Sequence, residues 1–262
     1  MRRILLSLAL SAAVQLPDAA FAQVDANAEI APKGTLRVGM NAANTTLVTQ
    51  APDGHVTGIS ADLGKFIAAK LSVPYEPVLY PGSAAYTDSF AKGGWDIIVT
   101  GRNAFAATMV DLTADVILID FVFVVAPGRQ FAHAGEVDRP GIRIGVARSA
   151  SADEYLSRTM KSAELVRTAG DIAAGIGLLR NNQADIYATV TDTALAIADR
   201  LPGATVIPGA FNTVGFAVAM PKGRSSIARD LLAQIVREAK ASGLLQQAID
   251  QAGLRGVRVA PD

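Results

Sequence analysis

Apolar residues in this chain recur with two different periods, and the two periods predict an alternation of strands and helices. Compact apolar runs, typical of buried strands, occupy residues 35–40, 95–100 and 116–125. Between the first two runs, one helix face is predicted by the spacing of Ile59, Leu63, Phe66 and Ile67. Ser60 suits the start of that helix as a cap. The alternation predicts an α/β protein with largely parallel sheets.

The same alternation starts again near residue 140. The further strands that it predicts are 142–147, 164–167, 184–190, 204–207 and 214–220. The further helices are 151–160, 171–180, 191–200 and, close to the end, 227–252 with an interruption at Gly243. Two successive sets of elements predict two α/β lobes, although the sequence contains no detectable internal repeat.

The first residues have the three-part pattern of a secretory signal. Met1-Arg2-Arg3 is basic, residues 4–16 are uncharged and apolar, and Ala20-Phe21-Ala22 has small residues where a signal peptidase reads. The alternative is a membrane anchor, but the apolar run is shorter than the roughly 20 residues that span a bilayer. We therefore expect a signal peptide over 1–22, cleavage after Ala22 and a periplasmic mature protein.

Composition excludes several classes of function. The 262 residues include 24 Lys and Arg, 24 Asp and Glu, two His and no Cys. The absence of cysteine excludes a disulfide framework and a thiol nucleophile, and two histidines leave little material for a metal centre. We therefore expect no metal and no cofactor. A formal net charge of zero provides no electrostatic footprint for nucleic acid.

Short motifs follow one another in a recognisable order along nearly the whole mature chain. Residues 34–40 read G-T-L-R-V-G-M, residues 93–101 read G-G-W-D-I-I-V-T-G, and residues 182–185 read N-Q-A-D. Other segments of this kind are 54–63, 110–113, 144–146, 154–156, 216–223 and 239–243. Together they resemble family 3 extracellular solute-binding proteins, the periplasmic receptors of amino-acid-type ABC importers. The resemblance rests on the order and spacing of the motifs.

The resemblance implies the type II periplasmic-binding-protein fold, in which two α/β lobes are joined by two crossing strands with a ligand cleft between them. Lobe 1 is expected over 34–125 and 213–262, and lobe 2 over 126–212. Pro127-Gly128 and Pro208-Gly209 are the expected hinge regions. The implied activity is capture of a small polar ligand, an amino acid or a related organic anion, by lobe closure. A monomer would deliver it to an ABC permease in the inner membrane.

Ligands of α/β sheets bind beyond the carboxyl ends of the strands, so the loops at those ends supply the candidate contacts. They are Asn41, Asn44, Thr45, Thr100, Gly101, Arg102, Arg148, Ser149, Ser151 and Asp192. Arg102 is a candidate clamp for an anion, and the helix start at Ser149 and Ser151 favours one as well. Asp192 is a candidate partner for a cation. The simpler alternatives are a surface arginine, ordinary capping and a first-turn acid.

The amino-acid anchors that the resemblance implies are replaced in this sequence. The loop 41–46 has no aromatic residue, segment 104–109 has no arginine, and Val190 occupies the position of the expected acid. A buried charge without a partner costs several kcal/mol. We therefore expect ordinary α-amino acids to bind weakly or not at all.

Two other functions fit the same scaffold, because a fold does not determine a function. One is a non-transport sensor, or an accessory protein of a periplasmic dehydrogenase system. The other is a dehydratase-like enzyme, for which the candidate loops offer only Asp192 and Arg102 as titratable groups. Capture of a solute without bond chemistry is the expected function.

Overall fold

The computed structural model describes residues 26–169 and 172–261 of the chain. Ten strands of this part form one mixed sheet, in which the order along the main path is β4-β1-β5-β11-β6-β9-β7-β8. The strands are β1 (Leu36–Asn41), β4 (Tyr75–Tyr80), β5 (Ile97–Gly101), β6 (Val110–Val125), β7 (Arg143–Ala147), β8 (Glu164–Thr168), β9 (Ile186–Val190), β10 (Thr205–Val206), β11 (Asn212–Pro221) and β12 (Val257–Val259). β2 (Thr49–Gln50) and β3 (Val56–Thr57) form a separate small hairpin.

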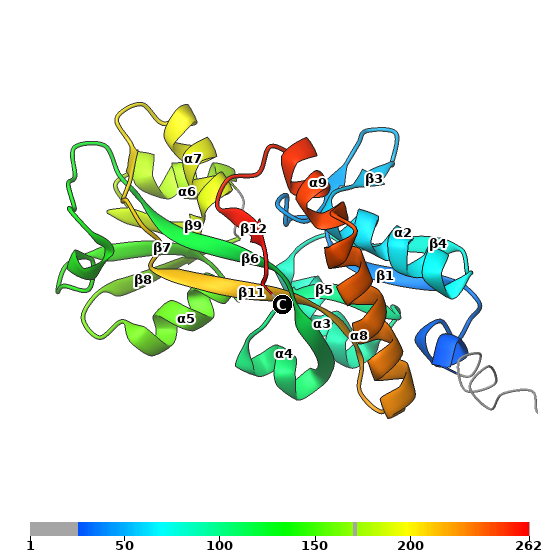
Figure 1. The fold of residues 1–262 in the computed structure, drawn as a ribbon. Helices are drawn as coiled ribbons and strands as arrows, with labels where there is room; N and C mark the ends of the chain where they lie inside the picture. The colour runs from blue at the N-terminus through cyan, green and yellow to red at the C-terminus, as the bar shows by residue number, and fades with distance from the viewer. Residues whose placement is uncertain (1–25, 170–171, 262) are drawn as a thin grey trace, which may run out of the picture.

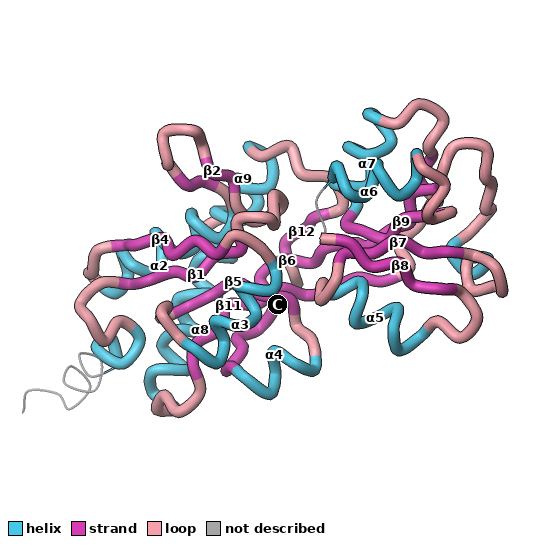
Figure 2. Tube along the Cα trace, turned by 180° about the vertical axis from the view of Figure 1, so that it is seen from behind, coloured by secondary structure: helices cyan, strands magenta, loops and turns pink. Residues whose placement is uncertain are grey.

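Helices flank the sheet in two groups (Figures 1 and 2). The group beside β1, β4 and β5 comprises α2 (Ile59–Leu71), α3 (Ser83–Lys92), α4 (Ala104–Met109), α8 (Ser226–Ala241) and α9 (Leu244–Gln251). The group beside β7, β8 and β9 comprises α5 (Ser151–Thr159), α6 (Ile172–Arg180) and α7 (Thr191–Arg200), and a short 3₁₀ turn, η1, covers Ala134–Glu136. The predicted α/β class and the two lobes are confirmed. No helix in the described ranges has the length and apolar character needed to cross a membrane.

Two long strands, β6 and β11, join the lobes (Figure 1). They pair antiparallel from Val110 to Phe121 of β6, and β6 then continues to Val125 as the neighbour of β9. β6 therefore pairs with lobe 2 from Phe121 onward, before the chain reaches Pro127-Gly128, and the expected hinges at Pro127-Gly128 and Pro208-Gly209 stay predictions. The residue boundaries 34–125 with 213–262, and 126–212, stay predictions. The expected signal peptide, 1–22, lies outside the described residues.

The two lobes are built around the same arginine–aspartate brace. In lobe 1 the backbone N–H of Arg37 donates to Asp96 Oδ2 (2.9 Å), and its guanidinium Nη2 donates to Oδ1 (2.6 Å). In lobe 2 Arg143 repeats both bonds to Asp185, at 2.8 and 3.1 Å. Both carboxylates are buried, and in each lobe the residue after the arginine is the Cα partner of the residue after the aspartate. The two lobes thus share a structural repeat, although the sequence shows no detectable one.

Asp120 on β6 connects four parts of the molecule. Its backbone N–H donates to the carbonyl of Gly256 (2.9 Å), and its carbonyl accepts from Thr191 Oγ1 at the start of α7 (3.1 Å). Its carboxylate accepts from Thr213 Oγ1 of β11 (2.6 Å) and from Arg258 Nη1 of β12 (2.8 Å). Both crossing strands, the C-terminal segment and a helix of lobe 2 therefore meet at one residue.

Helix α2 begins differently from the sequence expectation. Gly58, with φ 103°, precedes the helix, and Ser60 is a buried first-turn residue with no capping role. A side chain at Gly58 would be strained by the positive φ, and its Cβ would lie 2.7 Å from the carbonyl oxygen of Leu47. The chain therefore passes Leu47 too closely for a side chain at the residue before the helix.

Candidate ligand-binding site

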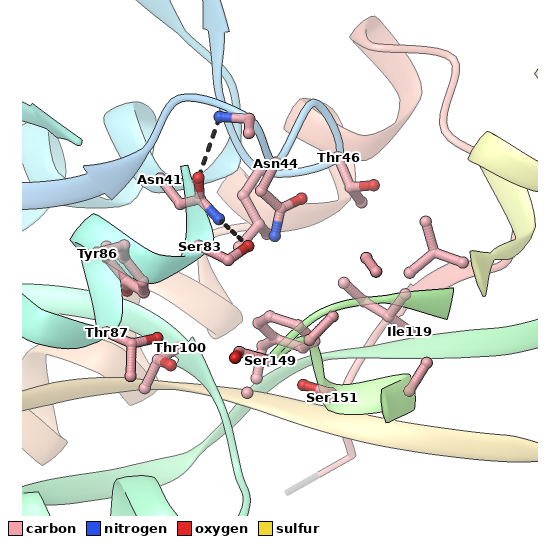
Figure 3. Close-up of a pocket in the computed structure, with 18 of the residues that line it drawn as sticks. Asn41, Asn44, Thr46, Ser83, Tyr86, Thr87, Thr100, Ile119, Ser149 and Ser151 are labelled. Carbon is pink, nitrogen blue, oxygen red and sulfur yellow. Dashed lines mark hydrogen bonds between the residues drawn. The ribbon is translucent and has the colours of Figure 1, made fainter. Parts of the chain in front are cut away.

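A cavity of about 490 Å³ lies between the two lobes. It is reached by the carboxyl ends of β1, β5, β7 and β9, through Asn41, Gly101, Ala147 and Val190. The crossing strands contribute to its wall as well, as Ile119 does (Figure 3). Its volume is in the range of small-molecule sites, and its position follows the rule for ligands of α/β sheets.

Seven of the ten residues expected from the sequence lie on the cavity wall. They are Asn41, Asn44, Thr45, Thr100, Gly101, Ser149 and Ser151. Lobe 1 provides the first five and lobe 2 the two serines, and Figure 3 shows Asn44 and the two serines on opposite sides of an open space. The structure brings these residues together, and their contact with a ligand stays a prediction.

The other three expected residues lie away from the wall. Arg102 Nε donates to Asp115 Oδ1 (2.7 Å), and its Nη2 donates to the carbonyl of Thr113. Asp192 Oδ1 lies 3.7 Å from Arg255 Nε, in the C-terminal segment. Arg148 follows β7, and its backbone N–H donates to Thr168. These partners give Arg102 and Asp192 structural roles, so we leave all three out of the proposed ligand contacts.

Asn41 and Asn44 have different roles, although both were expected as ligand contacts. The Oδ1 atom of Asn41 accepts from the backbone N–H of Ala43 (3.0 Å), and its Nδ2 donates to Ser83 Oγ (3.2 Å; Figure 3). Asn41 thus shapes the loop that follows β1. Among the hydrogen bonds between described residues, none uses the side chain of Asn44, so its amide is available to a ligand.

The start of α5 is occupied by a carboxylate of the protein itself. Ser149 has a left-handed backbone (φ 61°), and its N–H donates to Asp153 Oδ2 (3.0 Å). Asp153 also accepts from Arg167 Nε (2.9 Å) and from Ser157 Oγ (3.1 Å). Asp153 therefore places a negative charge of the protein in the first turn of α5, which weakens the expected attraction of this helix start for an external anion.

One side of the cavity is aromatic. Tyr86 Oη donates to the carbonyl of Val99 (2.9 Å), and burial raises the pKa of this phenol well above its ordinary value. Phe90 contacts the ring of Tyr86 edge-on (5.3 Å between centroids) and stacks on Phe105 (6.1 Å). Phe105 is 43% exposed and lines the cavity. These rings offer a ligand an apolar surface and no charge.

Several wall residues were missed by the sequence analysis. Ser83 and Thr87 come from α3, and Thr189 lies within β9. Glu154 belongs to α5 and is the one formally charged residue that the described wall contains. Their only local signal is closeness to a strand end or a helix start, which many residues that face solvent share.

Comparisons with known proteins agree with the fold. No protein-family model matches the sequence, and no curated protein matches it. Among solved structures, a mutant of ArgBP from T. maritima is 21% identical, with a TM-score of 0.71, 87% of this chain covered and 99% of that chain. The receptor for L-cysteine of Neisseria gonorrhoeae is 17% identical, with a TM-score of 0.74 and coverages of 90% and 99%.

A third similar structure is an ancestral amino acid-binding protein described as a precursor of cyclohexadienyl dehydratase. It is 18% identical, with a TM-score of 0.71, and the match covers 86% of this chain and 97% of that one. At these identities the likeness concerns the fold alone. The chain has the two-lobed fold of type II periplasmic binding proteins, and its structural neighbours are amino-acid-binding proteins.

Proposed function

We propose that this protein is a periplasmic solute-binding protein, which captures a small polar molecule by closing its two lobes and delivers it to an ABC importer in the inner membrane. The observation that carries the proposal is the cavity, because both lobes and the strands that join them contribute to one wall. A ligand that contacts both lobes stabilises their closed arrangement relative to the open one.

The neighbours support this class of function. ArgBP and the receptor for L-cysteine share the fold over nearly their whole length, and both are binding proteins. The expected periplasmic location, the single-chain state and the permease partner belong to the same proposal. A sensor or an accessory protein of a periplasmic dehydrogenase would use the same cavity, and its partner would be a kinase or a dehydrogenase instead of a permease.

A dehydratase-like enzyme is the second candidate, because one neighbour is described as a dehydratase precursor. Elimination of water requires a positioned acid and base. On the described wall, Glu154 is the one acid or base with a charge at neutral pH, and the phenol of Tyr86 is tied to a backbone carbonyl. This wall suits capture better than chemistry.

Native mass spectrometry of the exported protein tests the proposal. We expect one small molecule bound to each chain after gentle purification from the periplasm. Thr87→Trp places a bulky ring on the cavity wall and should remove the bound mass. Asp88→Trp, at the adjacent exposed position of α3, is the matched control and should retain it. Equal occupancy in both variants would place the ligand elsewhere and contradict the proposal.

A further inference from the structure

The described wall of the cavity carries almost no formal charge. Among the described wall residues, Glu154 alone carries a formal charge, and Arg158 lies 3.7 Å from its carboxylate. The sequence between Ala169 on the wall and Ile172 is Gly-Asp, which adds no positive charge. An anionic group would meet no cationic side chain on the described wall, and an ammonium group would meet only Glu154, which is already paired with Arg158. Either group would lose its hydration without gaining a free opposite charge.

The arginine nearest to a strand end on the cavity is used elsewhere. Arg102 follows Gly101, which lines the cavity, but its guanidinium is bound to Asp115 and to the carbonyl of Thr113 on β6. Its backbone N–H donates to Gly215 of β11 (2.7 Å). Turning Arg102 toward a ligand would break its ion pair with Asp115, so it serves the crossing strands and not the ligand.

The helix start that faces the cavity already carries two negative charges of the protein itself, Asp153 and Glu154 in the first turn of α5. The N–H of Ser149 is bound by Asp153, and the N–H of Ala150 donates to the carbonyl of Ala147 (3.3 Å). The first-turn carboxylates weaken the attraction of the helix dipole for an external carboxylate or phosphate. The side chains that this region turns to the cavity include the neutral hydroxyls of Ser149, before α5, and of Ser151, in its first turn.

Neutral hydrogen-bonding groups are present on both sides of the cavity. Lobe 1 contributes the amide of Asn44 and the hydroxyl of Thr46, and lobe 2 contributes the hydroxyls of Ser149 and Ser151 (Figure 3). Hydroxyls both donate and accept, and an amide does the same through two different atoms. Together with the exposed ring of Phe105, they match a molecule that has hydroxyl or amide groups and one apolar face.

We propose that the ligand of this cavity is uncharged: a small hydroxyl- or amide-bearing molecule with an apolar face, without a carboxylate, a phosphate or an ammonium group. This inference rests on the proposed function and narrows it to one chemical class. An uncharged ligand would distinguish this protein from its amino-acid-binding neighbours, although the protein shares their fold.

The molecule released from the purified protein by denaturation, identified by mass spectrometry, is the first test. An uncharged hydroxyl or amide compound is the expected result. A carboxylic acid, a phosphate, an amino acid or a cation would overturn the charge class and leave solute binding intact. If nothing is released, calorimetry with matched probes decides: nicotinamide against nicotinate, glucose against gluconate, and the α-amino acids.

In each probe pair that binds, we expect the neutral member to bind at least 10-fold more tightly than its acid. Stronger binding of the acid, or of any α-amino acid, would overturn the proposal. If no molecule is released and no probe binds, the proposed function itself is wrong. These results separate a failure of the ligand class from a failure of solute binding.

A variant that restores a cation at the wall gives an independent test. Phe105→Arg places a guanidinium at an exposed wall position, and Phe105→Met keeps a flexible apolar side chain there as the control. We expect Phe105→Arg to tighten binding of gluconate or nicotinate at least 10-fold relative to Phe105→Met. If the acids bind the wild type tightly and the arginine adds nothing, the wall already holds an anion site and the proposal is wrong.

Discussion

Gly215 and Asp115 face each other on the two crossing strands, and their contact leaves no room for a larger residue. A Cβ at Gly215 would overlap the carboxylate of Asp115, which is bound to Arg102. Gly215→Ala should therefore displace Asp115, break its bond to Arg102 and destabilise the protein by about 1–3 kcal/mol. Urea unfolding at neutral pH measures this loss.

The Asp115→Ala background provides the control for that prediction. With the carboxylate removed, the methyl group of Gly215→Ala has room, and its cost should fall below the cost in the wild type. Equal costs in the two backgrounds would mean that Asp115 is not the obstacle, and that backbone entropy or strain explains the loss.

The buried carboxylate of Asp185 makes stability depend on pH. Burial raises the pKa of this carboxyl. Hydrogen bonds from the side chain and backbone of Arg143, and the charge of Arg129, lower it by a larger amount, so the net pKa is below the ordinary value of 3.8. A lowered pKa stabilises the folded state above the pKa of the unfolded chain. This stabilisation is lost as the pH falls below about 4.

Asp185→Asn should therefore be less stable than the wild type at pH 6, and the difference should shrink toward pH 3. Urea unfolding at several pH values measures it. Asp88→Asn, an exposed carboxylate on α3, is the control for general loss of negative charge. A difference that stays constant from pH 6 to pH 3 would contradict the assignment of this pH dependence to Asp185.

At the scale of elements, the C-terminal segment braces the strand that connects the lobes. Asp120→Ala removes the acceptor of Thr213 and of Arg258, and it should lower the free energy of unfolding by about 1–3 kcal/mol. Arg258→Ala removes one half-exposed partner and should cost less than about 1 kcal/mol. If the two variants are equally stable in urea, Asp120 is not the central contact that we describe.

Sequence periodicity predicted most elements, because local spacing carries their signal. Helix α7 begins and ends where expected, at Thr191 and Arg200. β6 is longer than expected, since its first six residues include Asp111, Thr113 and Asp115 and pair with β11 in spite of their polarity. β12 has three residues, and only its pairing with β6 makes it a strand. Pairing over long sequence separations has no local pattern.

At the scale of the whole molecule, strand topology explains why the sequence located the cavity but not all of its contacts. The carboxyl ends of parallel strands meet in space, so Asn44, Thr100 and Ser151 were found from their positions after strands or at a helix start. Nothing local indicates that Asp115 holds Arg102, or that the carboxylate of Asp153 binds the N–H of Ser149 before α5. Both facts depend on the folded structure, and both change the expected charge of the ligand.

Calorimetric titration of the ligand-depleted protein with the molecule that it releases tests the central claim most directly. The account predicts one binding site per chain for an uncharged molecule, with binding lost in Thr87→Trp and retained in Asp88→Trp. Binding of equal strength in both variants would contradict the claim that the cavity between the lobes captures the solute.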